Sequence, residues 1–463
     1  MPILLAESIV MPPSQPWLPM LLLGMIMTIT YVAIACEWVH KSVAALAGAL
    51  VAVVTALALE VFRDEHGHSA YDRAVHDIIG HDLGVIGVIV GTSVLVEIVG
   101  RSGLFHFLAV RIVKQTGGDP QRLLAMLILA TLLFVSLLTI APGTMIMTSL
   151  TLVVTRALNL SPKPYMLAVA LTANSAALMT FASGICTLML GTAGRLPYLQ
   201  FFRVTTPVAL LTTGLCWWWV RWLYRSELVT TLSREELQAR VAAFDEWALV
   251  SDRRLFVRCA VLLGLTILGF ALAQPLRLGL DYVAFAGGTA ALLLSGIHPD
   301  EAIKKVNWTM ILFFVGLFVI IGAVQETGLL DWQARQMLAW SGGSQPTTLL
   351  MLAVFVLVLS GIVDNIPVAA TLIPVVRALE QQGLPGEPLW WTLIITANLG
   401  GNSTPIGSVS AVIALSALEK ERQVKVGWGE FLRVGGVLTL LQGGVALLYV
   451  LVFNLWGWFP ERP

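Results

Sequence analysis

Two stretches of the chain, GIVDNIPVAATLIPVV at residues 361–376 and ITANLGGNSTPIGSVS at residues 395–410, place polar residues inside long apolar segments. An unpaired polar group in hydrocarbon costs several kcal/mol, so these residues are expected to face something polar rather than lipid. A transmembrane helix that is broken at Gly or Pro frees backbone N–H and C=O groups and directs its half-helix ends at whatever fills the gap. The two stretches therefore predict half of a binding site for a solute or an ion.

The composition indicates a polytopic membrane protein. Of 463 residues, 57% are hydrophobic and 12% are charged, whereas about 25% charged residues is usual for a soluble domain. The 28 basic and 28 acidic residues balance, so nothing favours nucleic acid as a partner. The four cysteines are scattered without CxxC or CxxH spacing, which predicts neither a disulfide framework nor a metal site. The start of the chain has no basic segment before its apolar stretch, so the first span is expected to serve as its own targeting signal.

Long apolar runs predict the membrane spans. Ordinary spans are expected at Trp17–Ala35, Val43–Phe62, Leu83–Val99, Val204–Tyr224, Leu255–Ala273, Tyr282–Ile297, Trp308–Val324 and Phe431–Leu455. Four further runs are interrupted: residues 122–158 at 141–143, residues 164–194 at 175–184, residues 347–379 at 360–367, and residues 389–418 at 400–407. Two broken elements in each half are typical of transporters built from repeats.

The two halves of the chain align with each other. The matching pairs are IVGRSGLF at 98–105 with AVQETGLL at 323–330, the segments that end in Arg-Ala-Leu at 158 and 379, and the Thr-Ala-Asn triplets at 172–174 and 396–398. The offsets are nearly equal, so one duplication with small insertions explains all three matches.

Charge placement predicts the orientation. If the first broken element of each half is a re-entrant hairpin and the second crosses once, the chain makes ten crossings with both termini on one side. Most Arg and Lys residues then lie on the opposite side, in the loops 225–254, 304–305 and 419–425, which makes that side cytoplasmic and the termini extracytoplasmic. The hairpins enter from opposite faces, so the repeats are inverted. The predicted fold is all-α, with a first half at 1–224 (repeat at 83–224), a linker at 225–254 and a second half at 255–463 (repeat at 308–455).

Three segments outside the spans have their own patterns. The linker is amphipathic and predicts a surface helix that joins the halves, with regulation or lipid binding as the alternative. Amphipathic segments at 103–115 and 329–340 predict interfacial arms. The outer loop holds His66, His68, His76 and His81 among acidic residues, but without a four-ligand spacing this favours a solvated loop over a transition-metal site.

Asp364 is the one carboxylate within the broken segments of the second half. In a membrane it could carry a cation or a proton, while the plain alternative is a helix cap or a structural hydrogen bond. Amide, hydroxyl and freed carbonyl oxygens around it suit a hard cation or a small polyhydroxyl solute, and a glycine pair allows close approach of the backbone. The second-half candidates are Asp364, Asn365, Asn398, Gly401, Asn402, Ser403 and Thr404.

The first half lacks the carboxylate. Gly143 and Thr144 align with Asp364 and Asn365, and Leu178 replaces Asn402. A charged half-site that faces a neutral one is therefore predicted, rather than two equivalent cation sites. The first-half candidates are the neutral ligands Thr144, Asn174, Ser175 and Thr180.

The stretch 361–376 and the segment ANLGGNSTPIGSVSAVIALSALEKERQVKVGWGEFLRVG at 397–435 resemble the second-half signatures of the ion transporter superfamily. The similar branch contains arsenite permeases, NhaD sodium/proton antiporters and pigmentation P proteins, and the resemblance covers nearly all of the chain after Leu83. It implies an elevator-type fold with two re-entrant hairpins and two unwound helices around a midplane site. By matching position it also implies a site made of Asp364, Asn365, Asn398, Gly401, Asn402 and Thr404. The chain departs from NhaD-like members at Gly143, where they have Asp, and it lacks the Gly-Thr-Pro-Pro-Asn type of sequence of the dicarboxylate branch.

The expected function is secondary active transport of a small inorganic solute or cation, coupled to protons or sodium, with arsenite-type efflux and sodium/proton exchange as close competitors. The alternatives are anion or dicarboxylate symport and a passive ion channel of the same fold. An enzyme is not expected, since the spans hold no paired acids, no HExxH motif and no nucleophile with a base. ATP-driven transport is not expected either, because the sequence lacks the phosphate-binding motif GxxxxGK[ST]. No cofactor is expected beyond bound sodium or a proton. The resemblance implies a bacterial inner membrane protein and, by analogy with elevator carriers, a homodimer.

Overall fold

The structure, a computed structural model, describes residues 17–36, 38–62, 71–181, 183–230, 232–248, 250, 252–273 and 275–460, and all regular secondary structure in these ranges is helical. The segment with His66 and His68, and the side chains of His76 and His81, lie outside the described residues. The helices are α1 (Trp17–Ala35), α2 (Lys41–Ala58), α3 (Tyr71–Arg101), α4 (Leu104–Lys114), α5 (Pro120–Leu138), α6 (Ile140–Ala157), α7 (Pro162–Ala176), α8 (Ile185–Ala193), α9 (Tyr198–Leu223), α10 (Arg234–Ala242), α11 (Arg253–Leu272), α12 (Leu280–Ser295), α13 (Pro299–Ile303), α14 (Trp308–Glu326), α15 (Leu329–Ser341), α16 (Gln345–Ile362), α17 (Asn365–Gln381), α18 (Gly386–Gly400), α19 (Val409–Arg422), α20 (Trp428–Phe431), η1 (Leu432–Gly436) and α21 (Val437–Leu455).

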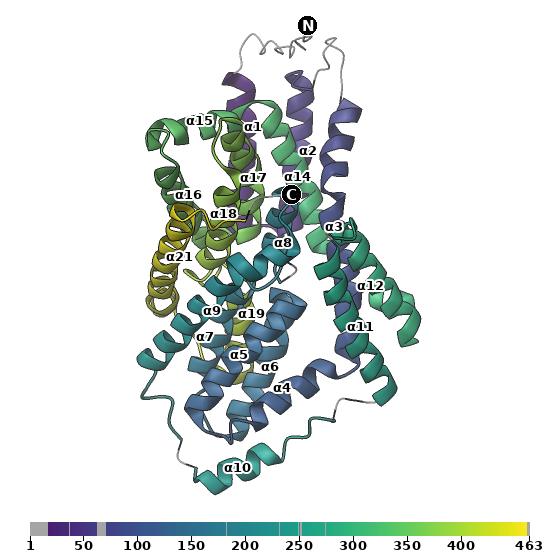
Figure 1. Ribbon diagram of the computed structural model, residues 1–463, viewed down its shortest axis with the longest axis vertical. Coiled ribbons are helices and arrows are strands. Elements are labelled where there is room, and N and C mark those ends of the chain that lie inside the picture. Colours follow the sequence, from purple (N-terminus) through teal and green to yellow (C-terminus); the bar gives the residue numbers. More distant parts are fainter. Residues whose placement is uncertain are drawn as a thin grey trace. The chain divides into compact units, whose positions relative to one another are not determined.

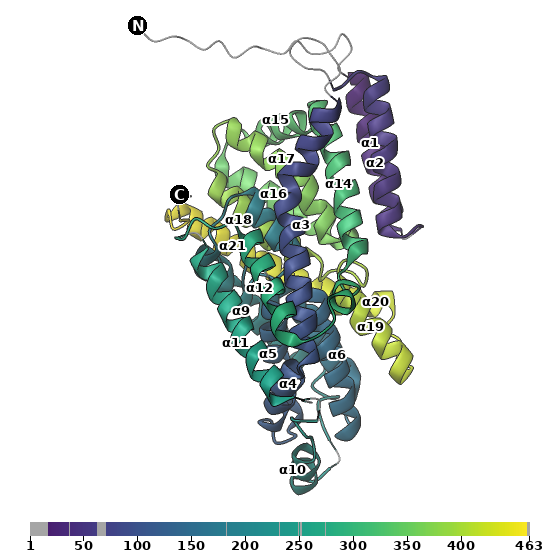
Figure 2. The ribbon, with the colours of Figure 1, turned by 90° about the vertical axis from the view of Figure 1, so that its right-hand side faces the viewer.

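The chain forms two compact units that cut across its two sequence halves. The first unit comprises residues 1–83 and 308–336. In it α2 packs against α1 and α14, and Figure 2 shows α1 and α2 side by side. A Cβ added to Gly316 of α14 would lie 2.6 Å from the backbone carbon of Ala45 in α2, so the two helices cross at backbone distance. Small residues at the crossing are the usual means of close helix packing in membranes.

The second unit comprises residues 84–307 and 337–463 and contains all four broken elements. Within it α19 packs against α6 and α7, and α8 packs against α17 and α18 (Figure 1). Because α8 follows α7 in the first half and α19 follows α18 in the second, each half contributes the last helix of its broken pair to the bundle of the other half. The two halves therefore interlock at their breaks.

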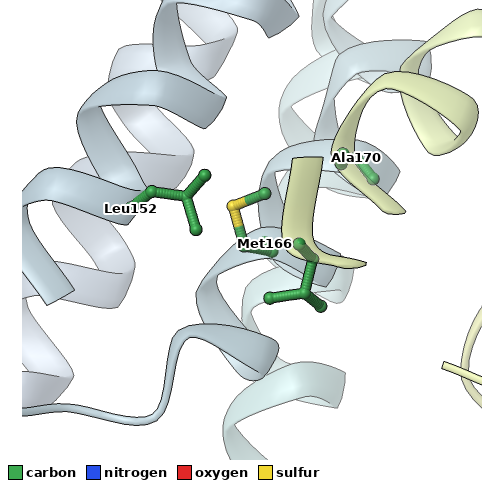
Figure 3. Packing of buried hydrophobic residues seen from close by; sticks show 5 residues of the cluster. Leu152, Met166 and Ala170 are labelled. Carbon is green, nitrogen blue, oxygen red and sulfur yellow. The ribbon is translucent and has the colours of Figure 1, made fainter. Parts of the chain in front are cut away.

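A buried apolar cluster shows this interlock in atomic detail. Leu152 of α6 and Met166 and Ala170 of α7 pack with Ala414 and Leu418 of α19. Leu152 points toward Met166 in Figure 3. All five side chains are at most 3% exposed, so each contributes the full apolar burial that a core side chain provides.

The two hairpins break close to the predicted positions. The first breaks at Thr139, which has φ +76°, rather than at the predicted residues 141–143. Pro142 instead lies in the first turn of α6, where no intrahelical partner for its missing N–H is needed. The second hairpin breaks at Val363 and Asp364, inside the predicted window of 360–367.

Helix length and composition agree with a protein embedded in a membrane. Among the described residues, eight helices are long and apolar enough to span a bilayer, and nine are if the bent pair α3 and α4 counts as one span. The eight differ from the predicted spans: α5, α6 and α16 belong to the predicted hairpins, whereas α9 and the 16-residue α12, both predicted to cross, are not among the eight. The pair α3 and α4 bends by 62° at Gly103, whose φ is +80°, a conformation that glycine adopts without strain. Helices α4 and α15 occupy the segments predicted as amphipathic arms.

The linker between the halves is folded onto the second unit. Helix α10 begins with a capping box formed by Ser233 and Glu236. Arg240 Nη1 donates to the carbonyl oxygen of Ala157 at 2.7 Å, which holds α10 at the end of α6. Glu246 pairs with Lys114 of α4, and this hydrogen bond with the ammonium group lowers the pKa of Glu246 below its usual value. The predicted surface helix is therefore present and docked.

Candidate solute and ion site

A chain of side-chain amides joins the two halves at their breaks. Asn174 Nδ2, at the end of α7, donates to Asn402 Oδ1, beyond the end of α18, at 2.8 Å. Asn402 Nδ2 donates to Gln442 Oε1 of α21 at 3.0 Å. Gln442 Nε2 donates to Ser175 Oγ at 3.2 Å and to the carbonyl oxygen of Thr212 at 2.9 Å. Since Ser175 follows Asn174 directly, the four side chains form a nearly closed ring, which we call the amide ring.

The amide ring is buried and closely surrounded by backbone. Its four side chains are at most 1% exposed. A Cβ on Gly401 would lie 2.9 Å from the carbonyl oxygen of Gly407 and 3.4 Å from Asn174 Nδ2, so only glycine fits comfortably beside the ring. A Cβ on Gly435 would lie 2.3 Å from the carbonyl oxygen of Asn402. The glycines of the predicted motif thus allow backbone and amides to approach closely.

Helix α8 brings a second set of contacts from the first half to the second. Asn398 Nδ2 donates to Thr187 Oγ1 at 3.1 Å and to the carbonyl oxygen of Ile394 at 2.8 Å. Cys186 Sγ donates to the carbonyl oxygen of Asn365 at 3.8 Å. Asn365 and Asn398 are therefore positioned by the same short helix, which begins directly after the break in the first half.

Equivalent threonines brace the two hairpins. Thr180 Oγ1 donates to the carbonyl oxygen of Ser136 at 3.2 Å, and Thr404 Oγ1 donates to that of Gly361 at 2.6 Å. Each acceptor lies within the last turn of the first hairpin helix, where carbonyl groups have no intrahelical partner. Ser403 Oγ donates to the carbonyl oxygen of Gly400 at 2.7 Å. The duplicated sequence positions 180 and 404 thus have the same structural role.

Asp364 occupies the N-cap position of α17 at the tip of the second hairpin. Its backbone has φ −46° and ψ 141°, and its side chain makes no capping hydrogen bond. Asp364 is half-buried, and its carboxylate oxygen Oδ1 is fully buried, while the neighbour Asn365 is 4% exposed. The position is that of a helix cap without a capping hydrogen bond, and a structural hydrogen bond stays the plain alternative to cation or proton binding. A negative charge here is favoured by the positive end of the α17 dipole.

Two amide oxygens and two hydroxyl groups near the breaks are buried and, in the described part of the chain, have no hydrogen-bond partner. They are Asn174 Oδ1, Asn398 Oδ1, Thr144 Oγ1 and Thr148 Oγ1. A buried polar atom without a partner costs about 1–3 kcal/mol. In native proteins, a buried polar atom without a partner usually has a function or contacts a bound molecule or ion. Because amide oxygens can only accept, the matching species carries hydrogen-bond donors or positive charge.

The structure brings most of the predicted residues together, though not all in one network. Asn174, Ser175 and Asn402 meet in the amide ring beside Gly401, whereas Asn365 and Asn398 meet at α8. Ser403, Thr404 and Thr180 brace the hairpins. Thr144 is fully buried on α6, but no hydrogen bond joins it to the other candidates.

Sequence reasoning missed Gln442, Thr187 and Cys186. Gln442 makes three of the hydrogen bonds of the site, yet it lies in the middle of a run that predicts an ordinary span. The available signal was an uncharged but strongly polar side chain among apolar residues in a transmembrane helix, which is rare without a function or a partner. Thr187 and Cys186 carry no such signal, because Thr and Cys are common in apolar helices.

Comparison with known proteins identifies the family. A family profile described as "CitMHS: Citrate transporter" matches residues 31–396 and 277–462. An uncharacterized transporter of Mycobacterium bovis is 28% identical over 424 residues, which cover 91% of this chain and 95% of the relative. The 46 kDa membrane protein of Mycobacterium leprae is 26% identical over 426 residues, which cover 91% and 96%. The P protein of Sus scrofa is 26% identical over 509 residues, which cover 92% of this chain and 59% of that protein.

A solved structure agrees with the fold. The YdaH transporter of Alcanivorax borkumensis superimposes with a TM-score of 0.63 at 16% sequence identity, covering 91% of this chain and 99% of that one. At this identity the likeness is one of fold: an all-helical polytopic membrane protein with a broken helix pair. The family profile and the Mycobacterium bovis relative are both described as transporters, so the protein is a membrane transporter and not an enzyme. The resemblance to the ion transporter superfamily, with the P proteins among its members, is confirmed, and the chain belongs to the CitMHS family of citrate-transporter-like secondary transporters.

Proposed function

We propose that this secondary transporter moves a small solute that carries hydrogen-bond donors or positive charge, coupled to a proton or a sodium ion at Asp364. The observation that carries the proposal is the pair of buried amide oxygens without partners at the breaks, on Asn174 and Asn398. A neutral arsenite-type solute would satisfy them with its hydroxyl groups. A sodium ion would satisfy them as a hard cation whose preferred ligands are oxygens.

The asymmetry of the site supports cation or proton coupling on one side only. Asp364 is the N-cap residue at the tip of the second hairpin, whereas the N-cap residue at the tip of the first is the neutral Thr139. Gly143, which aligns with Asp364 in sequence, lies inside α6. A carboxylate that is partly exposed at a break within the membrane changes its charge with its surroundings. Loading of the solute and protonation of Asp364 are therefore linked in the proposed cycle, with one charged half-site and one neutral one.

We further propose that the halves are inverted repeats that move as an elevator. Two observations support this: the reciprocal packing of α8 and α19 on the opposite halves, and the shared bracing role of Thr180 and Thr404. Because these contacts tie all four broken elements together, a movement of one would carry the others with it. In this proposal the repeats comprise residues 83–224 and 308–455, as the sequence predicts. The protein lies in a bacterial inner membrane and forms a homodimer.

A second candidate solute is a citrate-like carboxylate. The description of the family favours it, and so does the direction of α8 and α19, which begin at the two breaks with the positive ends of their dipoles. A carboxylate has no donors for the acceptor oxygens of Asn174 and Asn398, so it would need a cation bound with it. The remaining alternative is a passive channel of the same fold, through which solute would flow without coupling to a proton or a sodium ion.

The test is transport by the purified protein in liposomes with an imposed pH gradient. Sodium, lithium, arsenite, citrate and a dicarboxylate are compared, with and without sodium. Accumulation of one solute against its gradient supports coupled transport. Flux that only dissipates gradients contradicts it, and accumulation of citrate alone would favour the second candidate.

Asp364→Asn is expected to abolish pH-dependent transport, because the amide neither ionises nor exchanges a proton. The amide is nearly isosteric with the carboxylate, so folding should be unchanged. Initial rates are measured in liposomes between about pH 5 and pH 8, and folding is followed by size-exclusion chromatography and thermal melting. The matched control is Asp331→Asn, which removes an exposed carboxylate of α15. Wild-type transport with an unchanged pH profile in D364N would remove Asp364 from the mechanism.

A further inference from the structure

A cavity of about 280 Å³ lies away from the breaks, where the junction of α8 with α9 meets the junction of α11 with α12. Its walls include two arginines, Arg195 and Arg277, one from each junction, together with Tyr198 and Leu278. Neither guanidinium has an ion pair or hydrogen bond with any residue that the structure describes. Two unpaired guanidinium groups on one cavity form a site for an anion, since their forked donors match the oxygens of phosphate.

Both arginines have a backbone conformation that glycine usually adopts. Arg195 has φ +52° and Arg277 has φ +54°, so each is in the left-handed region that residues with a Cβ rarely adopt. Each follows the end of its helix, and the next residue closes the turn: Leu196 N–H donates to the carbonyl oxygen of Gly191, and Leu278 N–H to that of Ala273, both at 2.8 Å. The same conformation closes the turns after α2 and α6 at Glu60 and Asn159, so it is a common helix ending in this chain. What distinguishes Arg195 and Arg277 is that both line one cavity.

The surroundings of the cavity favour a lipid over a soluble anion. Leu199, Phe202 and Leu276, close in sequence to the lining residues, are 52%, 45% and 60% exposed, and in the topology proposed above such apolar side chains are available to acyl chains. Tyr198 of α9 stacks on Phe270 of α11 with ring centroids 5.9 Å apart, so an aromatic pair joins the two junctions beneath the arginines. Aromatic rings at headgroup level are usual at the membrane interface.

From these observations we propose that Arg195 and Arg277 bind the phosphate group of an anionic phospholipid, whose acyl chains lie along α9 and α11. The topology proposed above places both junctions on the extracytoplasmic side, so the lipid belongs to the outer leaflet of the inner membrane. The phosphate bridges two helix junctions that come from different sequence halves. Its expected effect is to hold these junctions together and to raise thermal stability.

The test compares phosphatidylglycerol with phosphatidylcholine of the same acyl chains, and both with glycerol 1-phosphate, on the purified protein in detergent. Retained lipid is counted by native mass spectrometry and stability is followed by thermal melting. The variant is R195G/R277G, because glycine suits the left-handed backbone and keeps both turns intact. The wild type is expected to retain phosphatidylglycerol and to gain several degrees in Tm, and the variant to bind it at least tenfold more weakly.

The matched control is R234Q/K420Q, which removes the same charge from exposed positions outside the cavity. If the double glycine variant is not monodisperse, R195G and R277G are compared singly, and each is expected to bind at least threefold more weakly. Equal binding of phosphatidylglycerol by the wild type and the glycine variants would overturn the proposal. Equal protection by glycerol 1-phosphate would overturn it as well, because the cavity would then be a site for a soluble anion.

Discussion

At the scale of single residues, Gln442 joins the two halves of the site. Its side chain connects Asn402 of the second half with Ser175 and the carbonyl oxygen of Thr212 of the first. A primary amide is suited to this position because it accepts through one atom and donates twice through the other. The hydrocarbon surroundings offer no water to replace any of these bonds.

Gln442→Leu is therefore expected to lower the free energy of unfolding by about 1–3 kcal/mol for each buried partner that it leaves unpaired. Transport should fall with it, because Asn174 and Asn402 lose their fixed orientation. Thermal melting in detergent measures the stability, and initial rates in liposomes measure the transport. The control Gln325→Leu changes an exposed glutamine of α14 and should be close to neutral. A Q442L protein as stable and active as the wild type would show that the amide ring is dispensable.

At the scale of helices, the second hairpin depends on a close contact between its first helix and the break after α18. A Cβ on Gly361 would lie 2.0 Å from Ser403 Oγ and 3.2 Å from Ser403 Cβ. The serine hydroxyl cannot rotate away freely, since it donates to the carbonyl oxygen of Gly400. The hairpin tip that carries Asp364 is thereby fixed against the polar break.

Gly361→Ala should destabilise the protein by about 1–3 kcal/mol through overpacking, and Ser403→Gly in the same chain should recover most of the loss. A double-mutant cycle of thermal melting measures this coupling. Gly444→Ala is the matched control, because Gly444 is also helical and has no atom within 4 Å of an added Cβ. It should be neutral or stabilising by up to about 1 kcal/mol. Additive effects of the two substitutions at 361 and 403 would contradict the proposed contact.

At the scale of the whole molecule, the proposed inversion of the repeats requires a defined orientation. Alkaline phosphatase fused after residue 463 should be active, since the C-terminus is predicted outside, and a fusion at residue 230 should be inactive, since the linker is predicted inside. Green fluorescent protein at the same positions should give the opposite pattern. Activity of the phosphatase at residue 230 would reverse the orientation, and activity at both would contradict an odd number of crossings between them.

Much of the fold could be predicted from the sequence because breaks and spans are local properties. Pro, Gly and polar residues within apolar runs identified the four broken elements, and the break at Val363 and Asp364 falls inside its predicted window. The first hairpin breaks at Thr139 rather than at Pro142, because proline is tolerated in the first turn of a helix and so marks a start as readily as a break. Asn174 and Asn402 were predicted as site residues, and they share a hydrogen bond.

The sequence by itself determined that the chain is a membrane protein with broken helices, and it predicted duplicated halves and a polar site at the breaks, because hydropathy and backbone-breaking residues act over a few residues at a time. Only the tertiary structure decided which groups meet. The exchange of α8 and α19 between the halves, the role of Gln442 and the shared cavity of Arg195 and Arg277 all depend on contacts between residues far apart in the chain. Helix packing in three dimensions fixes these contacts, and no local pattern encodes them.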